Sequence, residues 1–260
     1  MELKNTVAIV TGGARGIGRG IAYELAKEGV RIAVADLPVT SADRHETVAE
    51  IKRLGSDAIA VDLDVRDFAQ CQAMVQRTID AWGQVDVLVN NAGVIRIGPV
   101  VAFSEEDWDL VIDVNLKGTF LCSKAVAGHM MQRKKGAIIN LSSIAGKRGN
   151  PMVSAYTTSK FGVIGFTQSL AQEMAPSNVT VNAICPGEVD THMWRDVLAP
   201  AIGAATGVSA PEAFTQFIQQ RVPLGRPQTA ADMGQAVVFL CKAENITGIA
   251  LNVNGGTEMH

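Results

Sequence analysis

The middle of the chain carries three side chains that together could move a proton. Ser143 follows an apolar run, and Tyr156 and Lys160 come thirteen and seventeen residues later. Because Tyr156 and Lys160 are spaced i, i+4, a helix would place them on one face. A lysine ammonium beside a phenol favours the phenolate and lowers the pKa of the phenol toward that of a working acid or base. We therefore predict an acid/base site in which Ser143 Oγ hydrogen-bonds the reacting oxygen. A solvent-facing Tyr–Lys pair is the alternative.

A glycine-rich segment near the start of the chain could hold phosphate groups. Gly12, Gly16 and Gly18 lie between an apolar run and an amphipathic segment. A tight glycine turn that leads into a helix lets backbone N–H groups approach a pyrophosphate. The segment predicts a dinucleotide-binding loop, in which Ile17 is a further contact. An ordinary turn between a strand and a helix is the alternative.

The next apolar run ends in an acid that could bind the sugar of such a dinucleotide. Asp36 follows the glycines by about 20 residues, where a carboxylate accepts hydrogen bonds from the adenosine ribose. The same carboxylate repels the 2′-phosphate of NADP, and Leu37 supplies no cation in its place. These two residues predict NAD as the cofactor. Arg15 argues against NAD if its side chain binds a phosphate of the cofactor. If Arg15 is a solvated loop arginine, it has no bearing on the choice of cofactor.

Two further apolar runs end in polar or small residues that could line the same crevice. Asp64 follows one run, and Asn91, Ala92 and Gly93 follow the other. In open α/β sheets, ligands bind at the carboxyl ends of the strands. Asp64 is expected either to reach the adenine edge or to cap the next helix. The turn at Ala92 and Gly93 brings backbone close to the cofactor, whereas Asn90 either contributes there or ties neighbouring strands together.

Regular elements must position these residues, and the hydrophobic pattern predicts strands that alternate with helices. The predicted strands are Thr6–Val10, Arg31–Asp36, Ala58–Asp62, Val85–Asn90, Gly136–Leu141, Val179–Ile184 and Ile249–Val253. The predicted helices are Ile17–Glu28, Ala42–Leu54, Phe68–Trp82, Asn115–Arg133, Ala155–Met174 and Ala230–Leu240, with a shorter one from about Ser104. This alternation predicts an α/β fold, a single doubly wound (Rossmann) domain over 1–260 with a seven-stranded parallel sheet flanked by helices. Residues 188–222 are expected to form a partly helical substrate lid.

The composition narrows the remaining function classes. The chain of 260 residues has a formal net charge of −3 and is 47% hydrophobic, so it can build a core but offers no basic field for nucleic acid. Its apolar runs fall far short of the ~20 residues of a membrane span, and no signal segment precedes the first strand. We expect a cytoplasmic protein without membrane contact. The 4 cysteines and 4 histidines show no ligand spacing, so we expect no metal.

Taken in order, these motifs resemble those of the short-chain dehydrogenase/reductase family over essentially the whole chain. The resemblance implies NAD-dependent hydride transfer at a secondary alcohol carbon, with Ser143, Tyr156 and Lys160 as catalytic residues. It also implies that Asn115 holds a water in a proton relay to Lys160, whereas a kink in the helix is the alternative interpretation of this residue. The predicted cofactor-binding residues are Gly12, Arg15, Gly16, Ile17, Gly18, Asp36, Asp64, Val65, Asn91, Ala92, Gly93, Tyr156, Lys160, Pro186, Gly187, Val189 and Thr191.

The family resemblance further implies a homotetramer, in which helices 115–133 and 155–174 pair across an interface. The C-terminal segment departs from the family's usual Val-Asp-Gly-Gly, because Asn254 replaces the acid. That departure puts a local turn or a subunit contact in doubt, not the catalysis.

The substrate is predicted from the residues expected around the reacting carbon. These are Ile95, Arg96, Ser143, Lys147, Met152, Glu188 and Trp194, and His192 and Met193 belong to the same lid. Polar donors beside an apolar wall favour a small polyol or ketose, phosphorylated if Lys147 and Arg148 point inward. The loop and lid segments are also similar to those of family members that act on sugar alcohols, ketoses and acetoin or butanediol. A 3-oxoacyl thioester reductase, a steroid or xenobiotic carbonyl reductase and a non-catalytic nucleotide sensor are the alternatives.

Overall fold

All seven strands join one parallel sheet in the computed structural model, which describes residues 1–191 and 193–260. The strands are β1 (Val7–Thr11), β2 (Arg31–Asp36), β3 (Ala58–Asp62), β4 (Val87–Asn90), β5 (Gly136–Leu141), β6 (Val179–Pro186) and β7 (Ala250–Val253). Their order is β3-β2-β1-β4-β5-β6-β7, and every neighbouring pair is parallel. The order reverses between β1 and β4, which is where doubly wound sheets bind ligands. The predicted α/β class and seven-stranded parallel sheet are confirmed.

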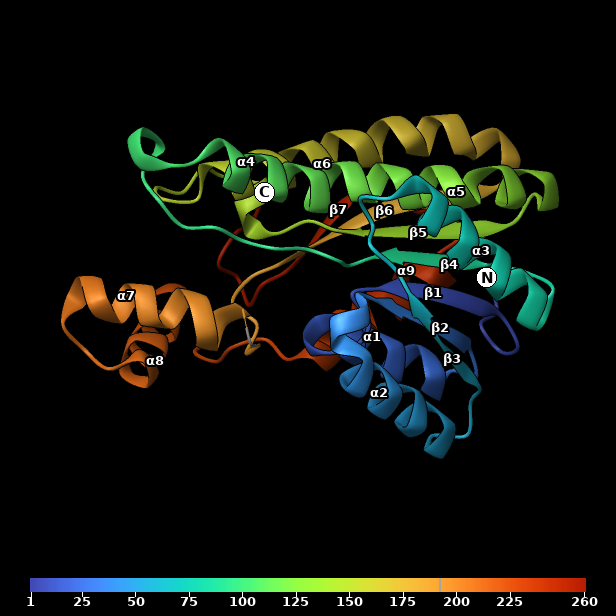
Figure 1. The fold of residues 1–260 in the computed structure, drawn as a ribbon, viewed down its shortest axis with the longest axis horizontal. Coiled ribbons are helices and arrows are strands. Elements are labelled where there is room, and N and C mark those ends of the chain that lie inside the picture. Colours follow the sequence, from blue (N-terminus) through green and yellow to red (C-terminus); the bar gives the residue numbers. More distant parts are fainter. Residues whose placement is uncertain (192) are drawn as a thin grey trace.

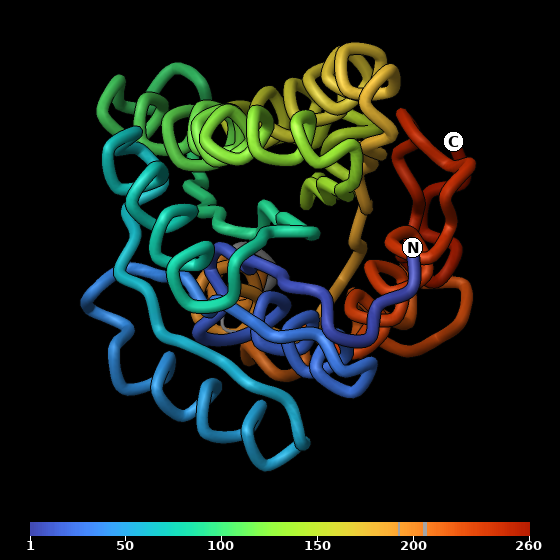
Figure 2. Tube along the Cα trace, turned by 90° about the vertical axis from the view of Figure 1, so that its right-hand side faces the viewer, coloured from blue at the N-terminus to red at the C-terminus, as the bar shows by residue number. Residues whose placement is uncertain are grey.

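Helices cover both faces of the sheet, as Figures 1 and 2 show from two directions. One face carries α3 (Phe68–Trp82), α5 (Gly118–Arg133) and α6 (Ser154–Met174), and the other carries α1 (Gly16–Lys27), α2 (Ser41–Arg53) and α9 (Ala230–Lys242). Strand side chains alternate between the two cores, so Ala8 and Val10 enter one and Ile9 the other. Because helices lie above and below, all of β1 is buried, and its sequence is continuously apolar rather than alternating.

The predicted helix 115–133 and the shorter helix after Ser104 form one continuous helical segment. α4 (Glu105–Ile112) passes through a wider π-helical turn, Asp113–Lys117, directly into α5. Asn115 is buried in this turn. A π turn inserts one extra residue into the helix and is frequent at functional sites. The two predicted helices are therefore joined without an interruption, because the chain accommodates Asn115 by widening the helix.

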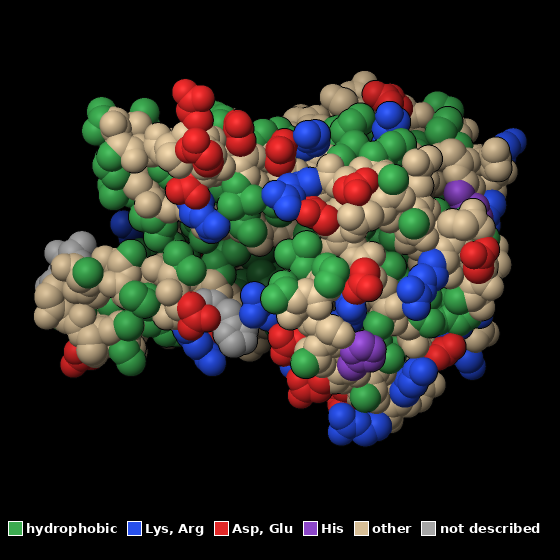
Figure 3. Space-filling view, in the orientation of Figure 1, with side chains coloured by type: hydrophobic (Ala, Val, Ile, Leu, Met, Phe, Trp, Pro, Cys, Tyr) green, Lys and Arg blue, Asp and Glu red, His purple; other side chains and the backbone are tan. Residues whose placement is uncertain are grey.

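Residues 188–222, called the arm from here on, leave the body of the molecule. The arm contains α7 (Ala199–Thr206) and α8 (Ala210–Arg221), which extend away from the sheet in Figure 1. Ser209 and Glu212 cap the start of α8 reciprocally. Figure 3 shows a hollow between the arm and the body, with hydrophobic side chains inside it. The partly helical character agrees with the expectation, and closure of the arm over a substrate stays a prediction.

Across the described part of the chain, every helix is too short or too polar to span a bilayer.

Candidate active site

β5 and α6 bring the three predicted catalytic side chains together. Ser143 lies just beyond β5, close enough to the Tyr156 phenol to hydrogen-bond with it. Lys160 is only 4% exposed, and its Nζ donates to the carbonyl oxygen of Leu141 at 2.7 Å. The same ammonium lies 5.5 Å from the centroid of the Tyr156 ring. A solvent-facing Tyr–Lys pair is therefore ruled out, because the lysine is buried at the carboxyl edge of the sheet.

The electrostatics of this pair differ from the sequence prediction. Desolvation raises the pKa of Tyr156 to about 12, against the opposing effect of the hydrogen bond from Ser143. Desolvation also lowers the pKa of Lys160 to about 8. The expected net lowering of the phenol pKa is not found in the protein on its own, because burial outweighs the hydrogen bond from Ser143. Burial therefore favours the neutral phenol of Tyr156 in the protein alone.

Asn115 connects the loop after β4 with α6. Its Oδ1 accepts from the Val94 N–H at 2.8 Å, and its Nδ2 donates to the Val94 carbonyl at 2.9 Å and to Ser159 Oγ at 3.0 Å. A Cβ added to Gly93 would lie 3.3 Å from Asn115 Oδ1 and 3.7 Å from Lys160 Nζ. The structure thus places Asn115, Gly93 and Lys160 side by side. The water relay implied by the family resemblance stays a proposal.

Two serines hold the catalytic helix in place, and the sequence reasoning assigned neither of them a role. Ser142 Oγ donates to the main-chain carbonyl of Lys160 at 2.9 Å. Ser159 Oγ donates to the carbonyl of Tyr156 at 2.7 Å while it accepts from Asn115. A buried hydroxyl in a helix satisfies itself locally, so nothing in the sequence singles out its second partner. The spacing of Ser159, three residues after Tyr156, is the one signal that placed it on the correct face.

The loop between β1 and α1 is packed too tightly for side chains at its glycines. A Cβ added to Gly18 would lie 2.2 Å from the carbonyl oxygen of Gly12, and one on Gly12 would lie 2.9 Å from Ala92 Cα. Gly12 and Gly16 also take positive φ angles of 62° and 56°. Among the described residues, no side chain caps the start of α1, so its first N–H groups and positive dipole end are available to an anion. The loop fits the pyrophosphate of a dinucleotide.

Asp36 holds its carboxylate against this glycine loop. Its Oδ2 accepts from the Ala14 N–H at 3.0 Å, and its Oδ1 accepts from the Leu37 N–H at 2.8 Å. The nearby cation Arg44 is 4% exposed and is already engaged, because it donates to the Asp36 carbonyl and pairs with Asp62. Arg15 is exposed to solvent. A fixed negative charge beside the loop favours a ribose diol over a phosphate.

The segment after β6 returns to the glycine loop. A Cβ added to Gly16 would lie 3.7 Å from Thr191 Cγ2, so the two predicted cofactor residues are neighbours. Val189 forms a parallel bridge with Gln228, which fixes the backbone of this segment. Gly187 packs on the C-terminal segment, since a Cβ there would lie 2.8 Å from Asn254 Cβ. The departure from the family pattern at Asn254 therefore lies beneath the segment that follows β6.

Asp64 and Val65, after β3, already have partners within the chain. Asp64 pairs with Arg66 at 2.6 Å, and this bond holds the pKa of the Asp64 carboxyl below its usual value. Asp67 rather than Asp64 caps α3, so the capping alternative for Asp64 is wrong. Val65 packs against α5, because a Cβ added to Gly118 would lie 2.6 Å from its Cγ2. Contact of Asp64 and Val65 with adenine stays a prediction.

Of the two asparagines at the end of β4, Asn90 has a structural role and Asn91 supports the turn beside the candidate site. Asn90 Nδ2 donates to Ser123 Oγ at 2.9 Å and to Asn140 Oδ1 at 2.8 Å, so Asn90 ties elements together as its alternative interpretation predicted. Asn91 Nδ2 donates to the carbonyls of Thr11 and Gly12 at 3.0 and 2.9 Å. These bonds hold the turn that contains Ala92 and Gly93 against the glycine loop.

The predicted substrate cations all have partners elsewhere in the chain. Lys147 Nζ donates to the carbonyl of Ala250 at 3.0 Å. Arg148 pairs with Glu258 at 3.4 Å, and Arg96 pairs with Asp107 at 2.9 Å. Binding of a substrate phosphate by Lys147 and Arg148 stays a prediction, and it would require both side chains to leave these partners.

The other predicted substrate residues lie at different depths. Ile95 is 6% exposed, Glu188 7% and Trp194 5%, whereas Met152 is 48% exposed. His192 lies outside the described residues. Glu188 and Trp194 contact each other, and both belong to the arm.

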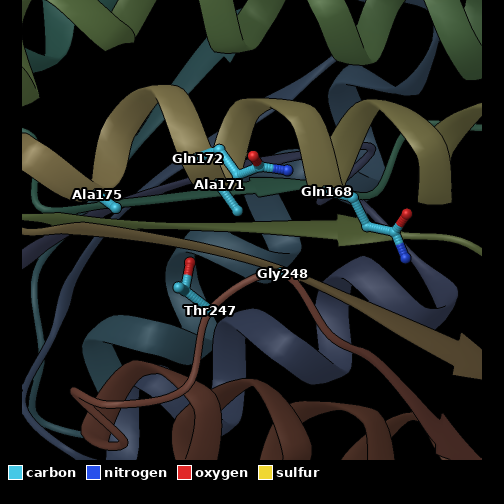
Figure 4. Close-up of a pocket in the computed structure, with 6 residues that line it drawn as sticks. All are labelled: Gln168, Ala171, Gln172, Ala175, Thr247 and Gly248. Carbon is cyan, nitrogen blue, oxygen red and sulfur yellow. The ribbon is translucent and has the colours of Figure 1, made fainter.

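A shallow pocket of about 380 Å³ lies at the opposite edge of the sheet. Figure 4 shows its lining, which comes from the second half of α6 and from the loop before β7: Gln168, Ala171, Gln172, Ala175, Thr247 and Gly248. The Gly248 N–H donates to the Val181 carbonyl near the start of β6, so this pocket is remote from the carboxyl strand ends. Its lining includes no titratable side chain, and we assign it no catalytic role.

Ser143, the half-buried Tyr156 and the buried Lys160, next to a loop that fits a dinucleotide, form the arrangement of oxidoreductases that move hydride with a nicotinamide cofactor. The family model described as short chain dehydrogenase matches residues 6–201. The chain belongs to the short-chain dehydrogenase/reductase family, as its sequence motifs predicted.

Named relatives extend over nearly the whole chain. A 3-oxoacyl-[acyl-carrier-protein] reductase of Staphylococcus aureus is 40% identical over 97% of this chain and 98% of its own. The BbsD subunit of the (2S)-[(R)-hydroxy(phenyl)methyl]succinyl-CoA dehydrogenase of Thauera aromatica is 36% identical over 100% and 99%. Among solved structures, a substituted actinorhodin polyketide ketoreductase with NADPH is 37% identical, with a TM-score of 0.94 and 98% of each chain covered. A levodione reductase is 29% identical, with a TM-score of 0.90 and 97% of each chain covered.

Proposed function

We propose that the protein interconverts a ketone and a secondary alcohol with NAD(H), and that the carbonyl belongs to a 3-oxoacyl thioester. The observation that carries the reaction class is the cluster of Ser143, Tyr156 and Lys160 beside the glycine loop, in which the serine and the lysine are buried and the tyrosine is half-buried. The names of two relatives, an acyl-carrier-protein reductase and a CoA-thioester dehydrogenase, support the substrate class. These names favour the thioester over the small polyol or ketose that the sequence led us to expect.

The chain's own residues supply position and proton transfer in this reaction. When bound, the nicotinamide donates or accepts the hydride. Tyr156 gives its proton to the carbonyl oxygen in reduction and takes it back in oxidation, and Ser143 hydrogen-bonds the same oxygen. Lys160 holds positive charge beside the phenol and so favours the phenolate over the phenol. Asn115 keeps the loop at Gly93 against Lys160.

NAD(H) is proposed on the evidence of the carboxylate at Asp36. Both oxygens of Asp36 are held by main-chain N–H groups at the loop, and Arg44 beside it is neutralised by Asp62. A 2′-phosphate at this place would meet a negative charge without a free buried cation among the described residues. The solved ketoreductase is described with NADPH, so the choice needs a direct test.

A polyol or diol is the second candidate substrate, on a different observation. Glu188, the first residue of the arm, is buried and its charge raises the pKa of Tyr156, and its carboxylate can accept a hydrogen bond from a substrate hydroxyl. The carbonyl oxygens of a 3-oxoacyl thioester are acceptors and do not use this group when it is ionised.

A panel of initial rates separates the two candidates. Acetoacetyl-CoA with NADH or NADPH tests the thioester, and sorbitol, xylitol and 2,3-butanediol with NAD or NADP test the second class. We expect the highest kcat/KM for the thioester with NADH, loss of at least about 10³-fold in Tyr156→Phe, and unchanged NADH binding in that variant. Full turnover by Tyr156→Phe would contradict the proposed mechanism, and turnover of polyols alone would contradict the proposed substrate.

The homotetramer and the cytoplasmic location stay predictions. The outer faces of α5 and α6 carry large exposed apolar side chains, among them Phe120 at 43% and Phe161 at 45% exposed. Such side chains are compatible with helix pairing between subunits. Light scattering would test the assembly, and a monomeric mass would contradict it.

A further inference from the structure

Glu188 is a carboxylate buried among aromatic groups at the end of β6, two residues beyond Pro186. Its main chain is fixed, because its carbonyl accepts from the Gln228 N–H at 3.0 Å. Its side chain is held as well, since Oε2 accepts from Trp194 Nε1 at 3.3 Å. Glu188 is 7% exposed and Trp194 5%. The carboxylate is therefore held in one position and is largely shielded from solvent.

The aromatic wall over Glu188 is formed by the arm. The Trp194 ring packs edge-on against Phe214 and Phe217 of α8, with ring centroids 5.1 and 5.0 Å apart. An apolar wall of this kind excludes water and strengthens the electrostatic effect of a charge behind it. The arm thus both covers the carboxylate and connects it to the part of the chain predicted to close over a substrate.

Among the described residues, Glu188 forms no ion pair with a lysine or arginine. Burial raises the pKa of its carboxyl above its usual value, and the hydrogen bond from Trp194 and the more distant Arg221 and Arg148 offset this only in part. Arg148 pairs with Glu258, and the Arg221 guanidinium lies over the Phe217 ring at 5.1 Å. The negative charge of Glu188 also raises the pKa of Tyr156, so it acts on the reacting group through space. Because β6 lies beside β5 and the Ser142 N–H donates to the Ile184 carbonyl, Glu188 and Ser143 follow neighbouring strands at one edge of the sheet, where a substrate carbonyl must lie.

We propose that Glu188 is a specificity-determining residue that excludes substrates with a carboxylate next to the reacting carbonyl and admits neutral ones. The proposal deepens the function given above, because a 3-oxoacyl thioester is neutral near its reacting carbon whereas the corresponding free 3-oxo acid is an anion. Two like charges roughly 5 Å apart at an effective dielectric constant near 20 repel strongly enough to change binding by tenfold or more. A neutral hydroxyl or thioester meets no such repulsion.

The experiment compares two substrates that share one acyl group. S-Acetoacetyl-N-acetylcysteamine is neutral and acetoacetate is an anion, and both are reduced with NADH. We expect the unaltered protein to prefer the thioester, and Glu188→Gln to reduce that preference at least tenfold through a gain in kcat/KM for acetoacetate. Gln keeps an acceptor for Trp194 and removes the charge. Glu188→Asp keeps the charge and should keep the preference, which separates charge from shape.

Asp190→Asn is the matched control, because Asp190 lies two residues away and pairs with the exposed Arg195. This variant loses the same charge outside the site and should leave the preference unchanged. An unchanged preference in Glu188→Gln would overturn the proposal.

Binding of acetoacetate to the protein–NADH complex, followed by NADH fluorescence, gives a second readout that needs no turnover. Tighter binding to Glu188→Gln supports the proposal, and equal binding to both proteins overturns it. Failure of the proposed function is distinguishable, because it would appear as no thioester reduction by the unaltered protein whatever residue stands at 188.

Discussion

The burial of Lys160 makes a direct prediction about the stability of the folded protein. Lys160 is 4% exposed and its pKa is about 8 in the folded state, against an ordinary value of 10.5. Between these two values the unfolded chain keeps the proton and the folded protein releases it. The unfolded state therefore binds more protons, and the free energy of unfolding rises with pH across this window. Lys160→Met, which keeps the length of the side chain and removes the ammonium, should abolish this contribution.

The size of the effect follows from the two pKa values. Each tenfold change in proton affinity corresponds to about 1.4 kcal/mol. Charged Lys160 thus costs about 3 kcal/mol in the folded protein at neutral pH. From pH 7 to pH 10 the free energy of unfolding of the unaltered protein should rise by about 2 to 3 kcal/mol relative to that of Lys160→Met. Loss of the hydrogen bond to the Leu141 carbonyl offsets the curves by a nearly constant amount, about 1 kcal/mol.

Urea unfolding at pH 7, 8, 9 and 10 measures this difference, because the other titrating groups are shared by the two proteins and cancel. Lys52→Met on α2 is the control, since its side chain is 56% exposed and loses one positive charge at the surface. A difference between Lys160→Met and the unaltered protein that stays flat with pH would refute the account of Lys160 as a buried, desolvated cation.

Three further variants test the cofactor choice, the glycine loop and the support of the site. Asp36→Ala with Leu37→Arg should improve NADP use relative to NAD at least tenfold by exchanging repulsion for attraction, and native preference for NADP would contradict our assignment. Gly18→Ala forces a Cβ to 2.2 Å from the Gly12 carbonyl and should weaken NADH binding at least tenfold, whereas Gly128→Ala, with open space around its Cβ, should not. Ser159→Ala should cost about 1 to 3 kcal/mol in urea unfolding, because Asn115 loses a buried acceptor, and an equal loss in exposed Thr158→Ala would contradict this.

The order of elements was predictable because the local periodicity of apolar residues indicates each strand and helix. Strands buried on both faces read as apolar runs, and α3 has the predicted bounds Phe68–Trp82. The segment 105–133 was not predictable, because a π turn changes the helix by one residue without altering the pattern on either side. The apolar pattern around Asn115 is therefore the same whether the helix is interrupted there or widens.

Site residues were predictable from the sequence where they stand at the end of a strand. They were not predictable where the position of a side chain depends on a partner far along the chain. Ser143 and Asp36 stand at the ends of β5 and β2, so topology alone brings them to one edge. Lys147 follows β5 as well, yet its ammonium bonds the Ala250 carbonyl. That carbonyl lies 103 residues further along the chain, and no local pattern signals the pairing.

The pKa values of Tyr156 and Lys160 likewise could not be predicted from sequence spacing alone. The i, i+4 spacing of Tyr156 and Lys160 correctly gives their proximity, but proximity alone predicts a lowered phenol pKa. Depth of burial decides the sign, and burial is a property of the whole fold: the loop at Gly93, the end of β5 and Glu188 on the arm all enclose the pair. In the protein alone, desolvation therefore favours the neutral phenol of Tyr156, which is the form that gives a proton to a carbonyl oxygen. Removal of the Glu188 charge should then make the phenol easier to ionise, which links the specificity of the arm to the chemistry at the sheet edge.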